Sequence, residues 1–483
     1  MNNKGILLNP EKKTWKNLST KLLDDIVPIK ENTRDIAISE ERKNIINDVF
    51  NKFKVDAKVV NYNIGHNVTR YNVELGMRSS LRTLSTLMSD IQIHLGDTPI
   101  RFSYITPGHQ TSGIEIPNEE YKPLAFKEVF NNLPKKNSFA IPLGKDIDGN
   151  IKSVDLRELP HMIIGGTTGS GKSMLIRSII NSLIMRNDPD SLKLILVDPK
   201  QIEMHRYREL PHLLCPIIKT ARECKQALEI LGQEMEKRYM AFLDKDCSNI
   251  KEYNELADTP FPYIVMIIDE YADIVDVDKT ASMPLTYLVQ RSRAAGIHLI
   301  IATQRPSPNV ITGVIKANMP AHIGLMTATM VESLTLLGES GAEKLLGKGD
   351  MLASSYLLSR SGLVRLQAPY VLRNETLNIT NYLRENYKPN YDQRFNGEQK
   401  KVEKLLEEIK HPKIDDENAE EEKYQEVKEW TMKQEYMSIS LIQRECSVGF
   451  NRACRYFLRL QKEGVVDTTP DGRKGCRVLK KLN

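Results

Sequence analysis

The segment from Gly165 to Ser173, which reads GGTTGSGKS, has the residue types and the spacing to hold a nucleotide phosphate. It completes the pattern G-x-x-x-x-G-K-S, in which glycines let backbone N–H groups wrap around phosphate oxygens. An apolar run, HMII, precedes it and a helical run, KSMLIRSII, follows, so the positive end of a helix faces the phosphates. We predict that the nucleotide is contacted by Gly166, Thr167, Thr168, Gly169, Ser170, Gly171, Lys172 and Ser173.

Asp269 and Glu270 follow the apolar run YIVMII, which places two carboxylates at the carboxyl end of a buried strand. Ligands of open parallel sheets bind at that edge. We predict that Asp269 binds the nucleotide through Mg²⁺, which it holds together with Ser173, and that Glu270 orients the attacking water. A glutamate directly after the aspartate favours ATP hydrolysis over a GTPase-type switch. The alternative is that the two acidic residues only begin a helix.

Two further candidates for catalysis lie around the run HLIIATQRP. Gln304 ends this strand with an amide that can sense the γ-phosphate or position water. Alternatively, Gln304 is only a polar residue at a strand end that faces solvent. Arg293 precedes the same strand, and ATPase sites often take an arginine from a neighbouring subunit. By sequence alone it is equally well one surface arginine among several.

The last 44 residues carry a local excess of positive charge, with ten Lys and Arg against four Asp and Glu. Here a helix, a turn at Gly449 and an amphipathic helix from about 450 to 463 form a helix-turn-helix pattern, and two strand-like runs joined by Pro470-Asp471-Gly472 form a wing. Such a module binds DNA with the first residues of its second helix. The alternative is a winged helix used only for protein contacts. The predicted DNA-binding residues are Asn451, Arg452, Arg455, Arg473 and Lys474.

The composition of the whole chain is that of an ordinary globular protein. It has 483 residues, 40% of them hydrophobic and 27% charged, and a net charge of only +5. Six cysteines without a C-x-x-C pair argue against a disulfide framework and a zinc site. No secretory signal and no apolar run of about 20 residues is visible. We therefore expect a cytoplasmic protein that does not insert into a membrane directly.

Composition and hydrophobic spacing divide the chain into zones. Between about 136 and 375, near-continuous apolar strands alternate with helical stretches, which predicts an α/β domain with a parallel sheet covered on both faces. The strand-like runs AKVVNYNIG and VTRYNVEL lie in a smaller α+β module upstream. The expected organisation is a polar lead-in at 1–33, the α+β module at 34–135, the P-loop α/β domain at 136–375, a helical and acidic linker at 376–423 and the winged helix at 424–483.

Taken together, these motifs make the sequence resemble the FtsK/SpoIIIE family of DNA translocases. The central part carries LPHMIIGGTTGSGKS, LILVDPKQIEM, EMEKRY, YIVMIIDEYAD, RAAGIHLIIATQRP and GAEKLLGKGDML. The upstream module, with VVNYNIGHNVTRYNVEL and SGIEIPN, looks like the family's α domain. The tail SISLIQRECSVGFNRACRYFLRLQKEGVV is similar to its winged-helix γ domain. The resemblance runs from about residue 34 to the end.

The resemblance implies a RecA-like motor that works as a hexameric ring around double-stranded DNA. It implies that Arg293 acts as an arginine finger and that the γ domain reads short DNA sequences to set direction, in some members with a site-specific recombinase as partner. Septal members carry an N-terminal membrane domain, and we expect this chain to be a member without one. The expected role is chromosome segregation at cell division or transfer of a mobile element. Two alternatives stay open, a protein-export ATPase and an ATP-switched DNA partition protein.

Overall fold

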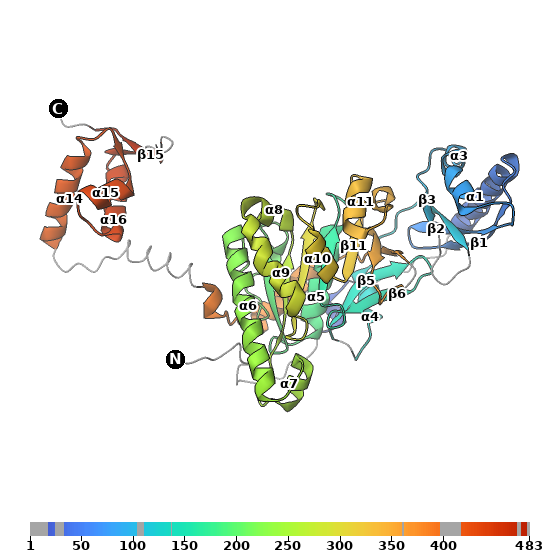
Figure 1. Ribbon diagram of the computed structural model, residues 1–483, viewed down its shortest axis with the longest axis horizontal. Coiled ribbons are helices and arrows are strands. Elements are labelled where there is room, and N and C mark those ends of the chain that lie inside the picture. The colour runs from blue at the N-terminus through green and yellow to red at the C-terminus, as the bar shows by residue number, and fades with distance from the viewer. Residues whose placement is uncertain are drawn as a thin grey trace. The chain divides into compact units, whose positions relative to one another are not determined.

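The computed structural model describes residues 18–24, 33–103, 111–136, 138–359, 362–396, 417–470 and 475–480. The chain divides into two compact units, residues 1–395 and 396–483, and each is described by itself. The first unit contains a four-stranded and a nine-stranded sheet, and the second a three-stranded sheet (Figure 1).

The four-stranded sheet near the N-terminus is antiparallel throughout, in the order β1-β2-β4-β3. Its residues Val59, Tyr71 and Ile114 are fully or almost fully buried against α1, which contributes Ile46 and Phe50. This confirms the predicted small α+β module. Its elements are α1 (Thr33–Lys52), β1 (Ala57–Ile64), β2 (Val68–Leu75), α2 (Leu81–Thr86), α3 (Met88–His94), β3 (Arg101–Ser103) and β4 (Ser112–Pro117).

The nine-stranded sheet has the order β6-β5-β13-β12-β11-β7-β10-β9-β8. The five strands from β11 to β8 are parallel, while the other four pair antiparallel. The sheet is therefore mixed, and the expectation of a parallel sheet holds for the half that runs from β11 to the edge strand β8. Its strands are β5 (Ala140–Asp146), β6 (Ile151–Asp155), β7 (His161–Gly165), β8 (Leu192–Val197), β9 (Tyr263–Ile268), β10 (Ile297–Thr303), β11 (Ala321–Leu325), β12 (Asp350–Ser354) and β13 (Val364–Gln367).

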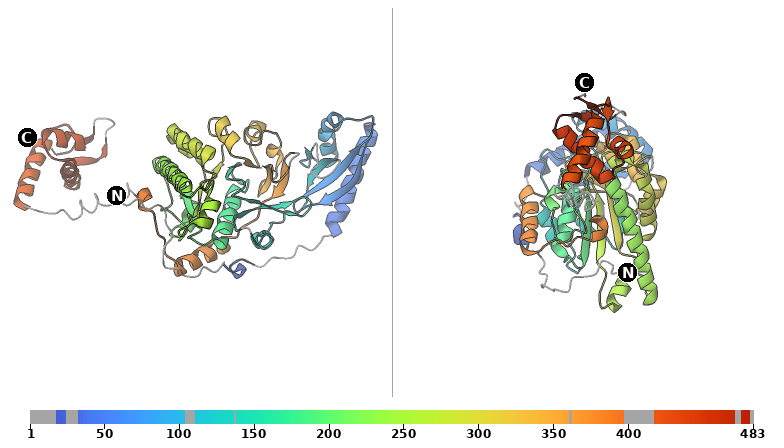
Figure 2. Two further views of the ribbon diagram at one scale, coloured as in Figure 1. Left: turned by 60° about the horizontal axis from the view of Figure 1, so that its bottom comes forward. Right: turned by 90° about the vertical axis from the view of Figure 1, so that its left-hand side faces the viewer.

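Helices cover both faces of this sheet, because successive side chains of a strand point to opposite sides. Met162 and Ile164 of β7 share a hydrophobic core with α5 and α12, whereas Ile163 shares one with α6 and α9. The helices on the two faces of the sheet can be followed in Figure 2. The α-helices are α4 (Phe126–Asn131), α5 (Lys172–Arg186), α6 (Ala221–Asp244), α7 (Ile250–Leu256), α8 (Tyr271–Val277), α9 (Ser282–Arg291), α10 (Gly313–Asn318), α11 (Met330–Leu337) and α12 (Arg373–Asn386). Short 3-10 helices are η1 (Thr20–Leu22), η2 (Met204–Tyr207), η3 (Lys279–Ala281), η4 (Ala342–Lys344) and η5 (Gln393–Asn396).

Two segments predicted to lie outside the folded domains, in the lead-in and the linker, belong to packed structure. Leu18 and Leu23, in the predicted lead-in, are buried in the core of the nine-stranded sheet. Ile379 and Leu383 of α12, in the predicted linker, are buried in the same core. Both segments are rich in polar and charged residues, so composition alone placed them outside the folded domains.

The second unit is a small helical module with a three-stranded sheet in the order β14-β16-β15. Residues 417–423, expected to be part of an acidic tether, form the start of α14, whose Tyr424 and Val427 are buried in the core. The predicted turn also differs, since Gly449 has φ −63° and Ser447 is the residue with positive φ, +53°. The elements are α14 (Glu417–Thr431), β14 (Tyr436–Met437), α15 (Ile439–Glu445), α16 (Phe450–Lys462), β15 (Val466–Pro470) and β16 (Cys476–Val478).

Candidate functional site

The predicted phosphate loop connects the end of β7 to the start of α5. Its glycines are required by geometry, as Gly171 shows. Gly171 has φ +103°, and a Cβ on it would lie 2.3 Å from the backbone nitrogen of Gly349. Lys348 N and Gly349 N donate hydrogen bonds to the carbonyls of Gly169 and Ser170, at 3.1 and 2.7 Å. A distant segment of the chain therefore fixes the shape of the loop.

Lys172 and Asp269 form a buried ion pair at the carboxyl edge of the sheet. The Lys172 ammonium donates to Asp269 Oδ1 at 2.9 Å and also to the Asp269 carbonyl. Their side chains are only 4% and 8% exposed. The lysine of the loop and the first acidic residue after β9 are thus brought together at one edge of the sheet.

Glu270 is held by the end of the neighbouring strand. Because β10 lies between β7 and β9, its last residues meet the acidic pair. The Glu270 carboxylate accepts from the Thr303 hydroxyl at 2.6 Å and from the backbone N–H of Gln304 at 3.0 and 3.1 Å. Gln304 in turn accepts from the hydroxyl of Thr168 through its side-chain oxygen, at 3.3 Å. The predicted polar residues at the two strand ends form one hydrogen-bonded chain.

A cleft of about 520 Å³ opens beside this edge, within the size range of small-molecule sites. Of the predicted residues, Thr167, Thr168, Gly169, Gly171, Lys172, Ser173 and Gln304 line it. Gly166, Ser170, Asp269 and Glu270 do not line it directly.

The cleft also has lining residues that sequence reasoning missed. Tyr121, Lys348 and Tyr370 come from segments far from the loop in sequence. The Tyr121 hydroxyl donates to the carbonyl of Lys348 at 2.9 Å, so the segment after the four-stranded sheet reaches the nucleotide site. The glycine pair in GKGD, Gly347 and Gly349, was the available signal, because both glycines have positive φ.

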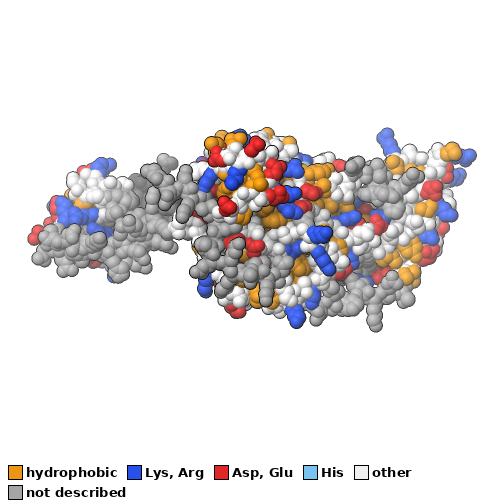
Figure 3. All heavy atoms as spheres, turned by 90° about the horizontal axis from the view of Figure 1, so that it is seen from below, with side chains coloured by type: hydrophobic (Ala, Val, Ile, Leu, Met, Phe, Trp, Pro, Cys, Tyr) orange, Lys and Arg blue, Asp and Glu red, His pale blue; other side chains and the backbone are white. Residues whose placement is uncertain are grey.

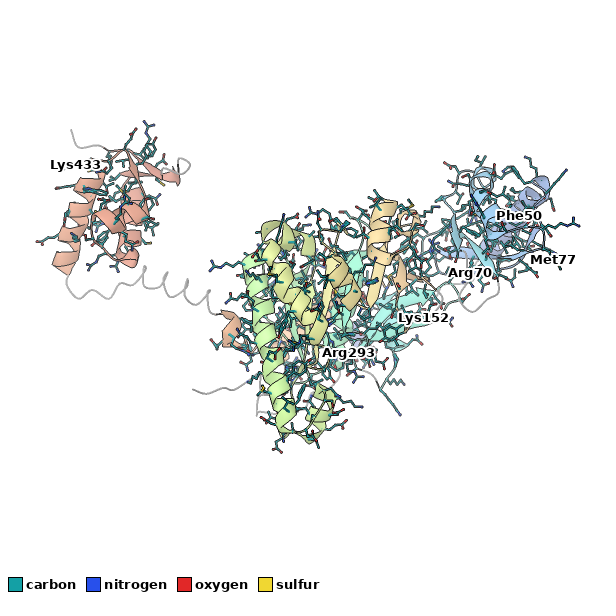
Figure 4. All side chains as sticks on the ribbon, viewed as in Figure 1. Phe50, Arg70, Met77, Lys152, Arg293 and Lys433 are labelled. Atoms are coloured by element: carbon teal, nitrogen blue, oxygen red, sulfur yellow. The ribbon has the colours of Figure 1, made fainter. Side chains whose placement is uncertain are left out.

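Arg293 does not join the site of its own chain. It lies on the turn between α9 and the start of β10, whereas the phosphate loop follows the carboxyl ends of the parallel strands. The seven residues of β10 separate the two places by roughly 20 Å at about 3.3 Å per residue. The Arg293 side chain is exposed, beside the lower part of α6 in Figure 4.

The predicted DNA-binding residues lie partly in the described chain. Arg452 and Arg455 stand in the first turns of α16, where Arg452 is exposed and Arg455 is half-buried. Ala453, Tyr456 and Leu460 of the same helix are buried, so the face of α16 that carries these three residues packs on the core. Asn451 belongs to this helix, but its side chain lies outside the described residues, as do Arg473 and Lys474 entirely. Lys and Arg side chains of this unit are visible in Figure 3.

The fold and the loop define a P-loop nucleotide-binding domain of the RecA-like class. In chain order its five parallel strands are arranged 5-1-4-3-2, with one strand inserted between the loop strand β7 and the acidic strand β9. The chain belongs to the FtsK/SpoIIIE family. The family's own model matches residues 130–308, the FtsK alpha domain model matches 19–118 and the gamma domain model matches 418–480.

Curated relatives support this assignment over most of the chain. The DNA translocase FtsK of Streptococcus pyogenes serotype M3 is 35% identical over 95% of this chain and 58% of its own. The DNA translocase FtsK of Staphylococcus aureus (strain Mu50) is 36% identical over 94% of this chain and 58% of its own. This chain therefore spans somewhat more than half the length of these relatives. Among its described helices, none is long and apolar enough to span a bilayer.

A solved structure shares the fold. The conjugation coupling protein TcpA, in a monomer form with ATPgS, superposes with a TM-score of 0.50 at 23% identity. The match covers 71% of this chain and 99% of that one. It supports the RecA-like architecture of the first unit.

Proposed function

We propose that this chain is an ATP-driven translocase of double-stranded DNA that works as a ring of six copies. The observation that carries the proposal is the convergence of Lys172, Asp269 and Glu270 at one sheet edge, in a chain that also bears a winged-helix module. The relatives named DNA translocase FtsK support the same conclusion. Chromosome segregation, transfer of a mobile element, a recombinase partner and a cytoplasmic location stay predictions.

In this proposal the site binds ATP with Mg²⁺. The donors suit this ion, because Mg²⁺ prefers oxygen ligands and Asp269 and Ser173 offer a carboxylate and a hydroxyl beside the loop. When bound, the ion neutralises charge on the β- and γ-phosphates. Lys172 turns from Asp269 to the phosphates, and the backbone N–H groups of the loop orient them. Glu270, held by Thr303 and Gln304, takes the proton of the attacking water.

Arg293 acts in a neighbouring copy's site. It is about 20 Å of strand away from its own cleft, so its guanidinium can stabilise the transferring phosphoryl group only across an interface between copies. Each cleft is then complete only in the ring. The winged-helix module reads the direction of travel through Arg452, Arg455 and Asn451 in α16, with Arg473 and Lys474 on phosphate.

A triplex-displacement assay tests the function. The full chain is incubated with ATP and a linear duplex that carries a third strand far from either end, and release of that strand is followed. A translocase releases it and hydrolyses ATP faster in the presence of duplex DNA, while Lys172→Ala does neither. ATP hydrolysis without release would point to an ATP-switched partition protein, and turnover that ignores DNA would point to an export ATPase.

A further inference from the structure

The turn that carries Arg293 is held at every backbone carbonyl. Between Arg291 and Gly296, each of the six carbonyl groups accepts a hydrogen bond. The donors, in order along the turn, are the Tyr239 hydroxyl, Ile297 N, Gly296 N, Ile250 N, the Arg238 guanidinium and Ile264 N. Six successive carbonyls that all accept hydrogen bonds within the protein are typical of the interior of a helix or sheet. Carbonyls of surface turns more often accept hydrogen bonds from water.

Two adjacent residues of α6 supply the side-chain donors. The Tyr239 hydroxyl donates to the Arg291 carbonyl, and Arg238 Nη1 donates to the Ala295 carbonyl at 2.8 Å. Their acceptors stand two residues before and two residues after Arg293. One helix therefore holds the turn from both sides of this arginine.

Burying the charge of Arg238 at this position costs desolvation free energy. Its side chain is completely buried, and an unpaired buried guanidinium would strongly destabilise the fold. Glu234 of the same helix compensates the charge, with its Oε1 3.1 Å from Arg238 Nε, and its Oε2 is bound by Arg394 at 2.9 Å. The Arg238 guanidinium also stacks over Phe261 at 5.1 Å. This fixed planar group is a rigid support for a backbone carbonyl.

The turn is also tightly packed against Ile250. Gly296 has φ +70°, and a Cβ on it would lie 2.5 Å from Ile250 Cδ1. Above the turn, by contrast, the Arg293 side chain is exposed, and within the described part of the chain it makes no hydrogen bond or ion pair. A fixed backbone thus presents a long, exposed cation.

We propose that Arg238 and Tyr239 are positioning residues, which hold the 291–296 turn so that Arg293 reaches the nucleotide of a neighbouring copy. The inference rests on the proposed function, in which Arg293 acts in trans. A transition-state contact depends steeply on geometry, since a shift of about 1 Å costs up to about 100-fold in rate. Loss of one support therefore slows hydrolysis without weakening ATP binding.

The main test is Tyr239→Phe in the full chain. This change removes only the hydroxyl and keeps the ring, which packs on Phe242. DNA-stimulated turnover is expected to fall about tenfold with KM for ATP unchanged. Arg238→Lys, which keeps the charge beside Glu234 but loses the planar fork, should behave alike.

Tyr287→Phe is the matched control. The Tyr287 hydroxyl contacts the side chains of Glu236 and Arg291, and it makes no contact with a carbonyl of the turn. Its loss is expected to leave kcat unchanged. If Tyr239→Phe also leaves kcat unchanged, or if KM rises instead, the positioning role is wrong.

Mixed rings separate positioning from a general defect. Lys172→Ala copies cannot use their own cleft but carry an intact turn. Mixed with Tyr239→Phe copies, they are expected to raise turnover per intact cleft towards the unaltered value, because they supply a correctly held Arg293. If Tyr239→Phe instead damages the cleft of its own copy, mixing will not raise turnover, and that result would overturn the inference.

Arg293→Ala distinguishes this inference from the function on which it rests. If that variant keeps full turnover, Arg293 is no finger and the role proposed for it in trans fails. If Arg293→Ala is inactive while Tyr239→Phe and Arg238→Lys are unaffected, only the positioning role fails.

Discussion

The ammonium of Lys172 lies 2.9 Å from Oδ1 of Asp269, a residue 97 positions further along the chain. Both groups are nearly buried, at a sheet edge where the phosphate loop and the acidic strand meet. The same two residues are expected to hold the phosphates and Mg²⁺ of ATP. Nucleotide binding and local stability are therefore coupled through this pair.

Replacing Lys172 by Ala should abolish ATP turnover and also destabilise the fold. It leaves the buried Asp269 carboxylate without its partner, which costs about 1–3 kcal/mol in the free energy of unfolding. The double variant Lys172→Met, Asp269→Asn should recover that stability and stay inactive. Thermal melts and ATPase assays on both variants measure the two effects. A double variant as unstable as Lys172→Ala would contradict the coupling.

Glu270→Gln should keep ATP binding and lose hydrolysis. The amide fills the same space and can still accept from Thr303 and Gln304, but it cannot take a proton from water. Turnover is expected to drop by about 10²–10⁴-fold at unchanged ATP affinity. Thr303→Ser, which keeps the hydroxyl bond to Glu270, is the control and should stay active. A Glu270→Gln protein with normal turnover would rule out Glu270 as the base.

Arg365→Ala should be among the most destabilising substitutions in the first unit. Arg365 binds Asp350 at 2.6 Å and Glu115 at 2.7 Å, and so joins the four-stranded sheet to the nine-stranded one. All three side chains are about 5% exposed or less. Its loss leaves the buried Asp350 carboxylate without its guanidinium and Glu115 with Arg101 alone, and should cost about 3–5 kcal/mol by urea unfolding. Arg34→Ala, which breaks an exposed pair with Glu119, should cost less than about 1 kcal/mol.

The same ion pairs give a pH dependence. Burial alone would raise the pKa of Glu115, but the guanidinium groups of Arg101 and Arg365 prevail and lower it. The unfolded chain therefore takes up a proton at this glutamate before the folded chain does. Its contribution is complete above the ordinary glutamate pKa of about 4.3 and is lost as the pH falls through the lowered one. The free energy of unfolding of the unaltered protein should fall more steeply between pH 5 and pH 3 than that of the double variant Glu115→Gln, Arg365→Met.

His161 should make stability fall as the medium becomes mildly acidic. Burial, with the neighbouring His298 imidazole and Arg293, lowers the pKa of His161 to about 3. Its Nδ1 accepts the N–H of Leu299 at 3.1 Å, so the neutral ring is needed. Below about pH 6.5 only the unfolded chain takes the proton, which costs at most about 1.4 kcal/mol per pH unit. Urea unfolding at pH 7, 6 and 5 measures the free energy of unfolding at each pH. It should fall less with falling pH in His161→Gln than in the unaltered protein, and an equal fall in both would refute this.

Arg452→Ala should reduce the preference for a cognate DNA sequence more than it reduces general affinity. A base contact of this kind is worth about 1–3 kcal/mol of discrimination. Arg477→Ala, which removes an exposed charge on β16 and leaves α16 unchanged, should weaken binding to cognate and scrambled duplexes alike. Competition binding at several salt concentrations measures both variants. The slope of log K against log salt concentration should become shallower by about 0.9 for each phosphate contact removed. An equal loss on both duplexes for Arg452→Ala would argue against base readout.

Much of the fold was readable because its strands are continuous apolar runs, such as Tyr263–Ile268 before the acidic pair. The antiparallel strands β12 and β13 were missed, since Asp350, Arg365 and Gln367 interrupt their apolar pattern. These polar side chains are buried: Arg365 pairs with Asp350 and Glu115, and the Gln367 amide donates to the carbonyl of Lys348, which only the assembled structure shows. Leu18 and Leu23 were missed because the few leucines of this stretch stand among polar and charged residues and are too few to show a period.

The sequence by itself determined the phosphate loop, the acidic pair and the winged-helix module, because each is a local unit whose chemistry follows from neighbouring residues. Only the tertiary structure decided which of them meet. Strand order inserts β10 between β7 and β9, and so it brings Thr303 and Gln304 to Glu270. The direction of β10 leaves Arg293 at the amino-terminal ends of the parallel strands, opposite the phosphate loop, on a turn held by α6. Hydrophobic spacing encodes which residues are buried, whereas the neighbour of each strand depends on how the whole core packs.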